Sequence, residues 1–325
     1  MIIDTHVHLF NFPSLIGHEE DLKSIKDIVS FRTRFPEVHK RMWREQPIDN
    51  SDDLVRDMDK HGIDISLVMR FRSPRDTNED IALAVKKHPG RLYGMARFDS
   101  DEDVPIRLWN DPAIERKKAP EQIRYFVEEL GMIAIGELNL RRFTKSNHPE
   151  EIAEDLAPIM EGCAHYKIPI SFMTAWTQFR GRLYHGNPEW VDEVAGLWPQ
   201  VPIILTKMGR SINYYFDVCF TVALRNANVY LDLTESCGEH VRKAIDWLGP
   251  HRLVFGTDWT CTQRWVQNPD IYTRTFKILD DAKCTPEERE WILWKTAAKV
   301  FNLDVVDKSQ QPVRRVKAPA AAVRG

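Results

Sequence analysis

The sequence is poor in cysteine and contains no long apolar run. Its five cysteines are scattered and never form a Cys-x-x-Cys pair, which argues against a disulfide framework or a structural zinc site and for reduced thiols. No apolar run approaches the roughly 20 residues of a membrane span. Strand-like sequence starts at Ile2 without a basic segment and cleavage site before it. We therefore expect a cytoplasmic protein. The cysteines are Cys163, Cys219, Cys237, Cys261 and Cys284.

The sequence also lacks an excess of charge of either sign. It has 45 Lys and Arg against 48 Asp and Glu, a net charge of -3, so neither a nucleic acid nor a membrane surface is expected as a partner. With 325 residues, 43% hydrophobic and 29% charged, the chain has the composition of a globular enzyme. No Gly-x-Gly-x-x-Gly segment follows an apolar run, which disfavours a dinucleotide-binding fold.

What the sequence does contain is a regular alternation of short apolar segments with helix-length segments. Eight apolar segments of this kind predict a parallel sheet closed into a (β/α)8 TIM barrel, with a doubly wound open sheet as the alternative. The barrel should span 1–303, with a capping insertion at 11–50 after the first strand and a disordered tail at 304–325. The predicted strands are 1–10, 64–71, 92–98, 132–138, 168–173, 201–207, 229–234 and 253–259. The predicted helices are 51–60, 80–88, 120–130, 151–166, 190–198, 216–225, 241–248 and 285–301.

Polar side chains follow several of these strands. His6 and His8 alternate with Asp4 on the first strand, so they should share one face and converge as metal ligands do. Asp258 ends the eighth strand and Glu137 the fourth. Because the active sites of TIM barrels lie where the strands end, these groups predict a divalent-cation site with Asp258 as general base on a metal-bound water. The alternative for Glu137 is a structural pair with a nearby arginine.

Arginines gather at the same predicted strand ends. A guanidinium binds carboxylate or phosphate through two parallel hydrogen bonds, so these arginines predict a small anionic substrate. The alternative is that they pair with Asp99, Asp101 or Glu137. Tryptophans in the later loops would wall a planar substrate or simply pack. The arginines are Arg70, Arg72, Arg97, Arg141, Arg142 and Arg210, and the tryptophans are Trp176, Trp259 and Trp265.

Three motifs together resemble a known family. Asp4-Thr5-His6-Val7-His8, Gly136-Glu137-Leu138 and Phe255-Gly256-Thr257-Asp258-Trp259 are similar to motifs of the amidohydrolase superfamily, over about residues 1–303. The most similar branch is the amidohydrolase-2 group that includes aminocarboxymuconate-semialdehyde decarboxylase. The resemblance implies that His6, His8 and Asp258 bind one divalent metal ion, often zinc, and that Asp258 also handles a proton.

Two positions depart from the family pattern. The pattern has histidines at the ends of the fifth and sixth strands, where this sequence has Met173 and Lys207. Methionine is a poor ligand for a borderline cation, and a protonated lysine repels one. Either Glu137 and His185 complete the metal site, or the protein works without metal. In the second case Lys207 near Asp258 would serve as base, electrophile or carboxylate anchor.

Three functions therefore stand as hypotheses. The first is a metal-dependent hydrolase that acts on a small carboxylate-bearing substrate through a metal-activated water. The second is a non-oxidative decarboxylase that uses the same residues. The third is a metal-free, degenerate barrel that uses Lys207 or serves as a binding protein. A homodimer is a further expectation for an enzyme of this size.

Overall fold

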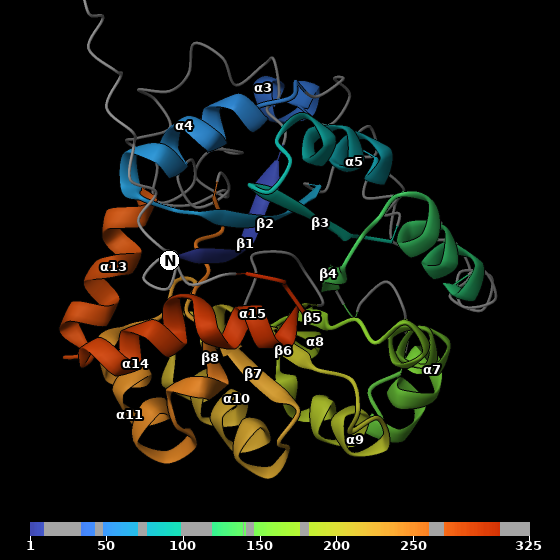
Figure 1. Ribbon diagram of the computed structural model, residues 1–325. Coiled ribbons are helices and arrows are strands. Elements are labelled where there is room, and N and C mark those ends of the chain that lie inside the picture. Colours follow the sequence, from blue (N-terminus) through green and yellow to red (C-terminus); the bar gives the residue numbers. More distant parts are fainter. Residues whose placement is uncertain are drawn as a thin grey trace, which may run out of the picture.

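The structure is a computed structural model that describes residues 1–9, 34–42, 48–70, 77–98, 119–138, 140, 146–175, 182–259 and 270–305. Within these residues, eight parallel strands form one sheet in the order in which they occur along the chain. The sheet curls into a nearly closed barrel, which confirms the predicted (β/α)8 architecture (Figure 1). The strands are β1 (Ile3–Leu9), β2 (Ile65–Arg70), β3 (Leu92–Ala96), β4 (Ala134–Leu138), β5 (Ile170–Met173), β6 (Ile203–Thr206), β7 (Val229–Asp232) and β8 (Leu253–Val254).

Helices lie around the outside of the strands (Figure 1). Every predicted helix is present, and α13 is a further helix that the sequence pattern did not indicate, because its first turns are rich in β-branched and aromatic residues of low helix propensity. The longer helices are α4 (Ser51–His61), α5 (Asn78–Lys87), α7 (Pro149–Tyr166), α9 (Val191–Leu197), α10 (Asn213–Arg225), α11 (Gly238–Leu248) and α13 (Ile271–Asp281). The shorter ones are α3 (Pro36–Met42), α8 (Arg182–His185), α14 (Pro286–Glu290) and α15 (Thr296–Val300), with π turns η3 (Tyr125–Glu129) and η8 (Trp291–Lys295).

Barrel closure depends on the segment that follows β8. The predicted eighth strand covers 253–259, whereas β8 is only two residues long. Beyond β8 the chain still pairs with β1: the backbone N–H of Asp258 donates to the carbonyl oxygen of His6 at 2.8 Å, and Val7 forms a parallel bridge with Trp259. An irregular extended segment therefore closes the sheet and brings the two ends of the barrel sequence together.

The carboxyl group of Asp4 holds this closure. The hydroxyl of Thr257 donates to Asp4 Oδ2 at 2.6 Å, and the N–H of Thr257 donates to Asp4 Oδ1 at 3.1 Å. The N–H of His6 also donates to Asp4 Oδ1, at 3.2 Å. Burial raises the pKa of Asp4 to about 7, against the lowering effect of the bond from Thr257. A single buried carboxyl group thus joins the first strand to the segment after the last.

Two apolar clusters lie on the two sides of the sheet. The larger packs the strands against the helices and contains Val7 together with Leu54 of α4. The smaller fills the interior of the barrel and contains Ile3 and Met95, with Phe301 from the end of the last helical segment packed into it. Side chains of a barrel strand normally alternate between these two environments.

Most of the predicted capping insertion and most of the predicted tail lie outside the described residues. Of the predicted insertion at 11–50, the structure describes residues 34–42, which include α3, and residues 48–50, and of the predicted tail at 304–325 it describes two residues. No helix in the described part of the chain has both the length and the apolar character that crossing a membrane requires.

Replacement of Thr257 by valine should destabilise the barrel. Thr257→Val keeps the side-chain shape but leaves a buried carboxyl oxygen of Asp4 without its donor, at an expected cost of about 2 kcal/mol in the free energy of unfolding. Urea denaturation measures this. Thr221→Val is the control, because Thr221 is exposed on α10 and its loss should change stability by less than about 0.5 kcal/mol. Equal urea midpoints for Thr257→Val and Thr221→Val would show that Asp4 does not need the hydrogen bond from Thr257.

Candidate metal centre

Four predicted site residues meet at the carboxyl ends of the strands. His6 Nε2 lies 3.6 Å from Glu137 Oε1 and 3.7 Å from Asp258 Oδ1. His8 Nε2 lies 3.5 Å from Glu137 Oε2 and 3.4 Å from Asp258 Oδ1. Each of these side chains is at most 6% exposed. The structure thus brings together two imidazoles and two carboxylates from β1, β4 and the segment after β8.

Each imidazole is fixed by a hydrogen bond at Nδ1, on the side of the ring that faces away from Glu137 and Asp258. His6 Nδ1 donates to Asp232 Oδ2 on β7 at 2.6 Å. His8 Nδ1 donates to the carbonyl oxygen of Arg70 at 3.1 Å. An acceptor at Nδ1 selects the tautomer whose lone pair is at Nε2, which is how metal-binding histidines are usually oriented. In both residues this lone pair is directed at Glu137 and Asp258.

Two buried atoms at the centre lack a hydrogen-bond partner among the described residues, His6 Nε2 and Asp258 Oδ1. Tetrahedral coordination with bonds of about 2.0–2.2 Å separates ligand atoms by roughly 3.3–3.6 Å. The four histidine–carboxylate separations of 3.4 to 3.7 Å are close to this range. His6, His8 and Glu137 each offer a ligand atom within 4.8 Å of the others, and we call these three residues the cation-binding group because they could hold a metal ion. The residues present therefore fit a divalent cation of the zinc type.

Lys207 lies on the other side of the two carboxylates. Its Nζ donates to Asp258 Oδ2 at 2.5 Å and lies 3.5 Å from Glu137 Oε1. Burial acts to lower the pKa of Lys207, but Asp258 and Glu137 outweigh burial and raise it above its usual value. In the same way burial acts to raise the pKa of Asp258, and Lys207 holds it well below its usual range. Lys207 and Asp258 therefore form a buried ion pair.

The two histidines differ in their electrostatic environment. Burial and the ammonium of Lys207 act to lower the pKa of His6, yet the carboxylate of Asp232 makes the net shift upward. Burial lowers the pKa of His8, and its contacts with Glu137 and Asp258 do not reverse the shift. Without a cation, His6 is thus the imidazole that binds a proton more readily.

The strand ends that carry the site have left-handed backbone. Glu137 has φ of 23°, Lys207 of 67° and Asp258 of 60°. This region costs a residue other than glycine about 1–2 kcal/mol. Such conformations persist where the surroundings enforce them, and they gather at functional sites. Here they occur at three of the strand ends whose charged side chains meet in the centre.

Two of the predicted substrate-binding arginines are occupied with the backbone of the site. Arg97 donates to the carbonyl oxygens of Glu137, at 3.0 Å, and of Arg70, at 3.2 Å. Arg70 donates to the carbonyl oxygen of Phe98 at 2.9 Å. The Arg70 carbonyl that receives Arg97 also receives His8, so Arg97 supports the ring orientation of His8. Contact of Arg70 or Arg97 with a substrate stays a prediction.

The remaining predicted binding residues have other contacts. Arg210 forms an ion pair with Glu235 near the rim. Trp259 is buried, and its indole N–H donates to Asp57 of α4 at 3.0 Å. Whether Arg210 and Trp259 also touch substrate stays a prediction. Outside the described residues lie Arg72, Arg141, Arg142, Trp176 and Trp265.

The structure also describes Met173, which departs from the family pattern, and His185, which was expected to help complete the metal site. Met173 ends β5 and is buried. His185 lies on α8, where its Nε2 faces the carbonyl oxygen of Ser146 at 3.4 Å, and it is not a member of the cation-binding group. Of the two residues that were expected to complete the site, the structure places Glu137 in it and leaves His185 outside.

Sequence reasoning missed Asp232, the partner of His6. The signal was present, because Asp232 ends an apolar strand in the same way as Asp258 follows the last one. Its second oxygen accepts the N–H of Thr234 at 2.6 Å, which fixes the carboxylate in place.

Comparison with known proteins identifies relatives of the whole barrel. A sequence model of the amidohydrolase family matches residues 3–303. No curated protein matches the chain.

Solved structures share the fold at low sequence identity. A probable 2-pyrone-4,6-dicarboxylic acid hydrolase of Acinetobacter baumannii has a TM-score of 0.55 at 14% identity, over 93% of this chain and 99% of that one. The 4-oxalomesaconate hydratase of Rhodopseudomonas palustris has a TM-score of 0.58 at 14% identity, over 93% and 96%. A zinc-bound amidohydrolase of Burkholderia multivorans has a TM-score of 0.58 at 11% identity, over 93% and 99%.

Gly256 should be required for the Asp232–His6 pair. A Cβ at this position would lie 2.5 Å from Asp232 Oδ1 and 2.9 Å from His6 Cβ, so both side chains would have to move. Gly256→Ala should therefore weaken zinc binding by about 10-fold or more, the usual effect of disturbing a partner of a metal ligand. Competition with a chromophoric chelator measures the affinity. Gly196→Ala on α9, where a Cβ meets no atom within 4 Å, is the matched control. Equal zinc affinities of Gly256→Ala and Gly196→Ala would contradict the role given to Gly256.

Proposed function

Because the chain belongs to the amidohydrolase family, we propose that it is a metal-dependent hydrolase that cleaves a small carboxylate-bearing substrate with water. The observation that carries the proposal is the buried cation-binding group of His6, His8 and Glu137 with Asp258 Oδ1 3.4 Å from His8 Nε2. Two atoms there, His6 Nε2 and Asp258 Oδ1, have no hydrogen-bond partner among the described residues. The group lies at the carboxyl end of the strands, where TIM-barrel enzymes have their active sites.

His6 Nε2, His8 Nε2, Asp258 Oδ1 and a carboxylate oxygen of Glu137 would hold the cation. A divalent cation there supplies Lewis acidity, which makes water a better nucleophile near neutral pH and polarises the bond under attack. Asp232 and the carbonyl oxygen of Arg70 keep the imidazole lone pairs directed at the site.

Asp258 would move the proton. One of its oxygens faces both imidazoles, where the cation would lie, and the other is held by Lys207, so the carboxylate stays beside a water that the cation would bind. It accepts a proton from the attacking water and returns it to the leaving group, the usual task of a carboxylate base. Lys207 keeps Asp258 ionised before the reaction.

The positive charge on one side of the site supports the proposal that the substrate carries a carboxylate. Lys207 and Arg210 both follow β6, and Arg210 is close to the rim. An ammonium and a guanidinium are the usual partners of carboxylates. Two of the similar structures are named for carboxylic acid substrates, a 2-pyrone-4,6-dicarboxylic acid hydrolase and a 4-oxalomesaconate hydratase.

Non-oxidative decarboxylation is the second candidate, and the contact between Lys207 and Asp258 favours it. Loss of CO₂ leaves a carbanion that must take up a proton, and the ammonium group held 2.5 Å from Asp258 is a proton donor inside the site. Both reactions would use the same four cation ligands, so the products must distinguish them.

Metal content is the first test. Protein purified without a chelating tag should carry about one divalent metal ion per chain, because the donor set suits a single cation. The His6→Ala/His8→Ala variant should carry almost none, since it loses both imidazoles. Plasma mass spectrometry measures both. His185→Ala is the control and should keep the metal, because His185 lies outside the group. Wild-type protein without metal would contradict the proposal and leave the metal-free barrel, in which Lys207 is the group to test.

Product masses separate the two reactions. The metal-loaded protein is incubated with lactones, amides and aromatic acids that carry a free carboxylate. Hydrolysis adds one water to the substrate, whereas decarboxylation removes one CO₂, so mass spectrometry decides between them. Asp258→Asn should lower the rate by at least about 100-fold in either case. Asp281→Asn is the control, because Asp281 forms an exposed pair with Lys277 on α13. An Asp258→Asn variant as fast as wild type would contradict the role of Asp258.

A further inference from the structure

Two strands of the barrel contain one extra residue beside the metal centre. On β1, Asp4 pairs with Ser66 of β2 and Val7 pairs with Val68, so three steps on β1 face two on β2. This is a β-bulge, and it falls at Thr5 and His6. Bulges next to active sites commonly redirect a side chain.

The second bulge is on β4. Ile135 pairs with Ile170 of β5 and Leu138 pairs with Phe172, so β4 also has one residue more than its neighbour. The extra residue falls at Gly136 and Glu137. The bulged segments of β1 and β4 therefore each contain a residue of the cation-binding group.

The distribution of apolar residues shows what these bulges do. Ile3 and Val7 are four residues apart and would share a face on a regular strand, yet Ile3 belongs to the interior cluster and Val7 to the cluster under the helices. Ala134 and Leu138 of β4 are divided in the same way. Each bulge shifts by one residue the alternation of side chains between the barrel interior and the helix side. As a result, a ligand residue can come directly after a residue that faces the interior, as His6 comes after Thr5.

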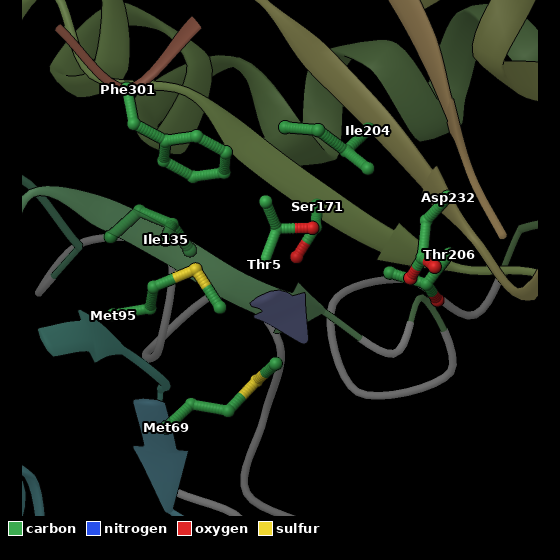
Figure 2. A pocket seen from close by; sticks show the side chains of 9 residues that line it. All are labelled: Thr5, Met69, Met95, Ile135, Ser171, Ile204, Thr206, Asp232 and Phe301. Carbon is green, nitrogen blue, oxygen red and sulfur yellow. The ribbon is translucent and has the colours of Figure 1, made fainter. Parts of the chain in front are cut away.

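At each bulge a side-chain oxygen accepts the backbone N–H of the ligand. The N–H of His6 donates to Asp4 Oδ1 at 3.2 Å, and the N–H of Glu137 donates to Ser171 Oγ at 2.6 Å. Ser171 is buried on β5 beside the bulge, and it lines an interior cavity together with Thr5, as Figure 2 shows. Its contact is with the backbone of Glu137, which has φ of 23°.

We propose that Ser171 is a positioning residue of the metal centre: its hydroxyl holds the β4 bulge and so aims the carboxylate of Glu137 at the two imidazoles. This inference rests on the proposed function, because it assigns Ser171 a task in cation binding. Asp4 does the same for His6, but Asp4 also closes the barrel, so Ser171 gives the cleaner test.

Zinc affinity of the full-length protein, measured by competition with a chromophoric chelator, tests the role of Ser171. Ser171→Ala should weaken zinc binding by about 10-fold to 100-fold, the usual range for a residue that supports a ligand. Ser171→Thr keeps the hydroxyl and should stay within about 3-fold of wild type, because the added methyl borders a cavity. Ser171→Cys keeps the size with a weak acceptor, and it gives the same test should the alanine variant fail to fold.

A double-mutant cycle separates positioning from a general loss of stability. If Ser171 acts through Glu137, Ser171→Ala should weaken binding by less than about 2-fold when it is added to Glu137→Gln, because the ligand that it aims is already impaired. Thr275→Val, which removes a buried hydroxyl from α13, is the control and should leave zinc affinity unchanged.

The outcomes distinguish this inference from the proposed function. Loss of affinity in Ser171→Ala, with rescue by threonine and no further loss in the Glu137→Gln background, is the expected result. Zinc binding of Ser171→Ala equal to wild type, or an undiminished loss in the Glu137→Gln background, would overturn the role of Ser171 and leave the metal site standing. Wild-type protein that binds no zinc would overturn both.

Discussion

The contact between β1 and the segment after β8 is the constraint on which the rest of the site depends. Asp4 and Thr257 are 253 positions apart, and a buried carboxyl group joins them. The same segment carries Asp258, whose N–H donates to His6. Ring closure therefore places the carboxylate of the last segment against the imidazoles of the first strand, so the bonds that complete the fold also assemble the candidate metal centre.

This arrangement concentrates ionisable groups where water is excluded. Buried charges are costly unless each has partners, and the bonds of the site supply them. Asp232 receives His6 and Thr234, and Asp258 receives Lys207. Among the side-chain atoms of His6, His8, Glu137 and Asp258, the buried ones without a hydrogen bond to the described residues are His6 Nε2 and Asp258 Oδ1, which face each other at 3.7 Å. A cation between them would satisfy both atoms, whereas a hydrogen bond could not form at that distance.

Much of this structure followed from simple sequence rules. Apolar strands alternating with helices predicted the barrel, and polar residues at strand ends predicted the meeting of His6, His8, Glu137 and Asp258. The wrong placement of Asp4 has a different cause from the missed α13 helix: the alternation rule assumes a regular strand. Strict alternation placed Asp4 on the same face as His6, but the β1 bulge changes the alternation, and Thr5 rather than Asp4 lines the interior cavity. No composition rule reveals a single extra residue in a strand, because pairing with the neighbouring strand defines it.

Two positions depart from the family pattern, and the geometry of the site decides what they do. Judged by residue type alone, Met173 and Lys207 remove two histidine ligands, and a lysine beside a cation is unfavourable. The geometry changes that judgement, because Asp258 presents separate oxygens to the imidazoles and to Lys207. Glu137 divides its contacts less strictly, because Oε2 faces His8 whereas Oε1 lies 3.6 Å from His6 Nε2 and 3.5 Å from Lys207 Nζ. Two carboxylates thus lie between the ammonium and the imidazoles and reduce the repulsion that a cation at the imidazoles would feel. Lys207 occupies one side of this carboxylate pair as a positive charge, and the imidazole side is where the proposed divalent ion would bind.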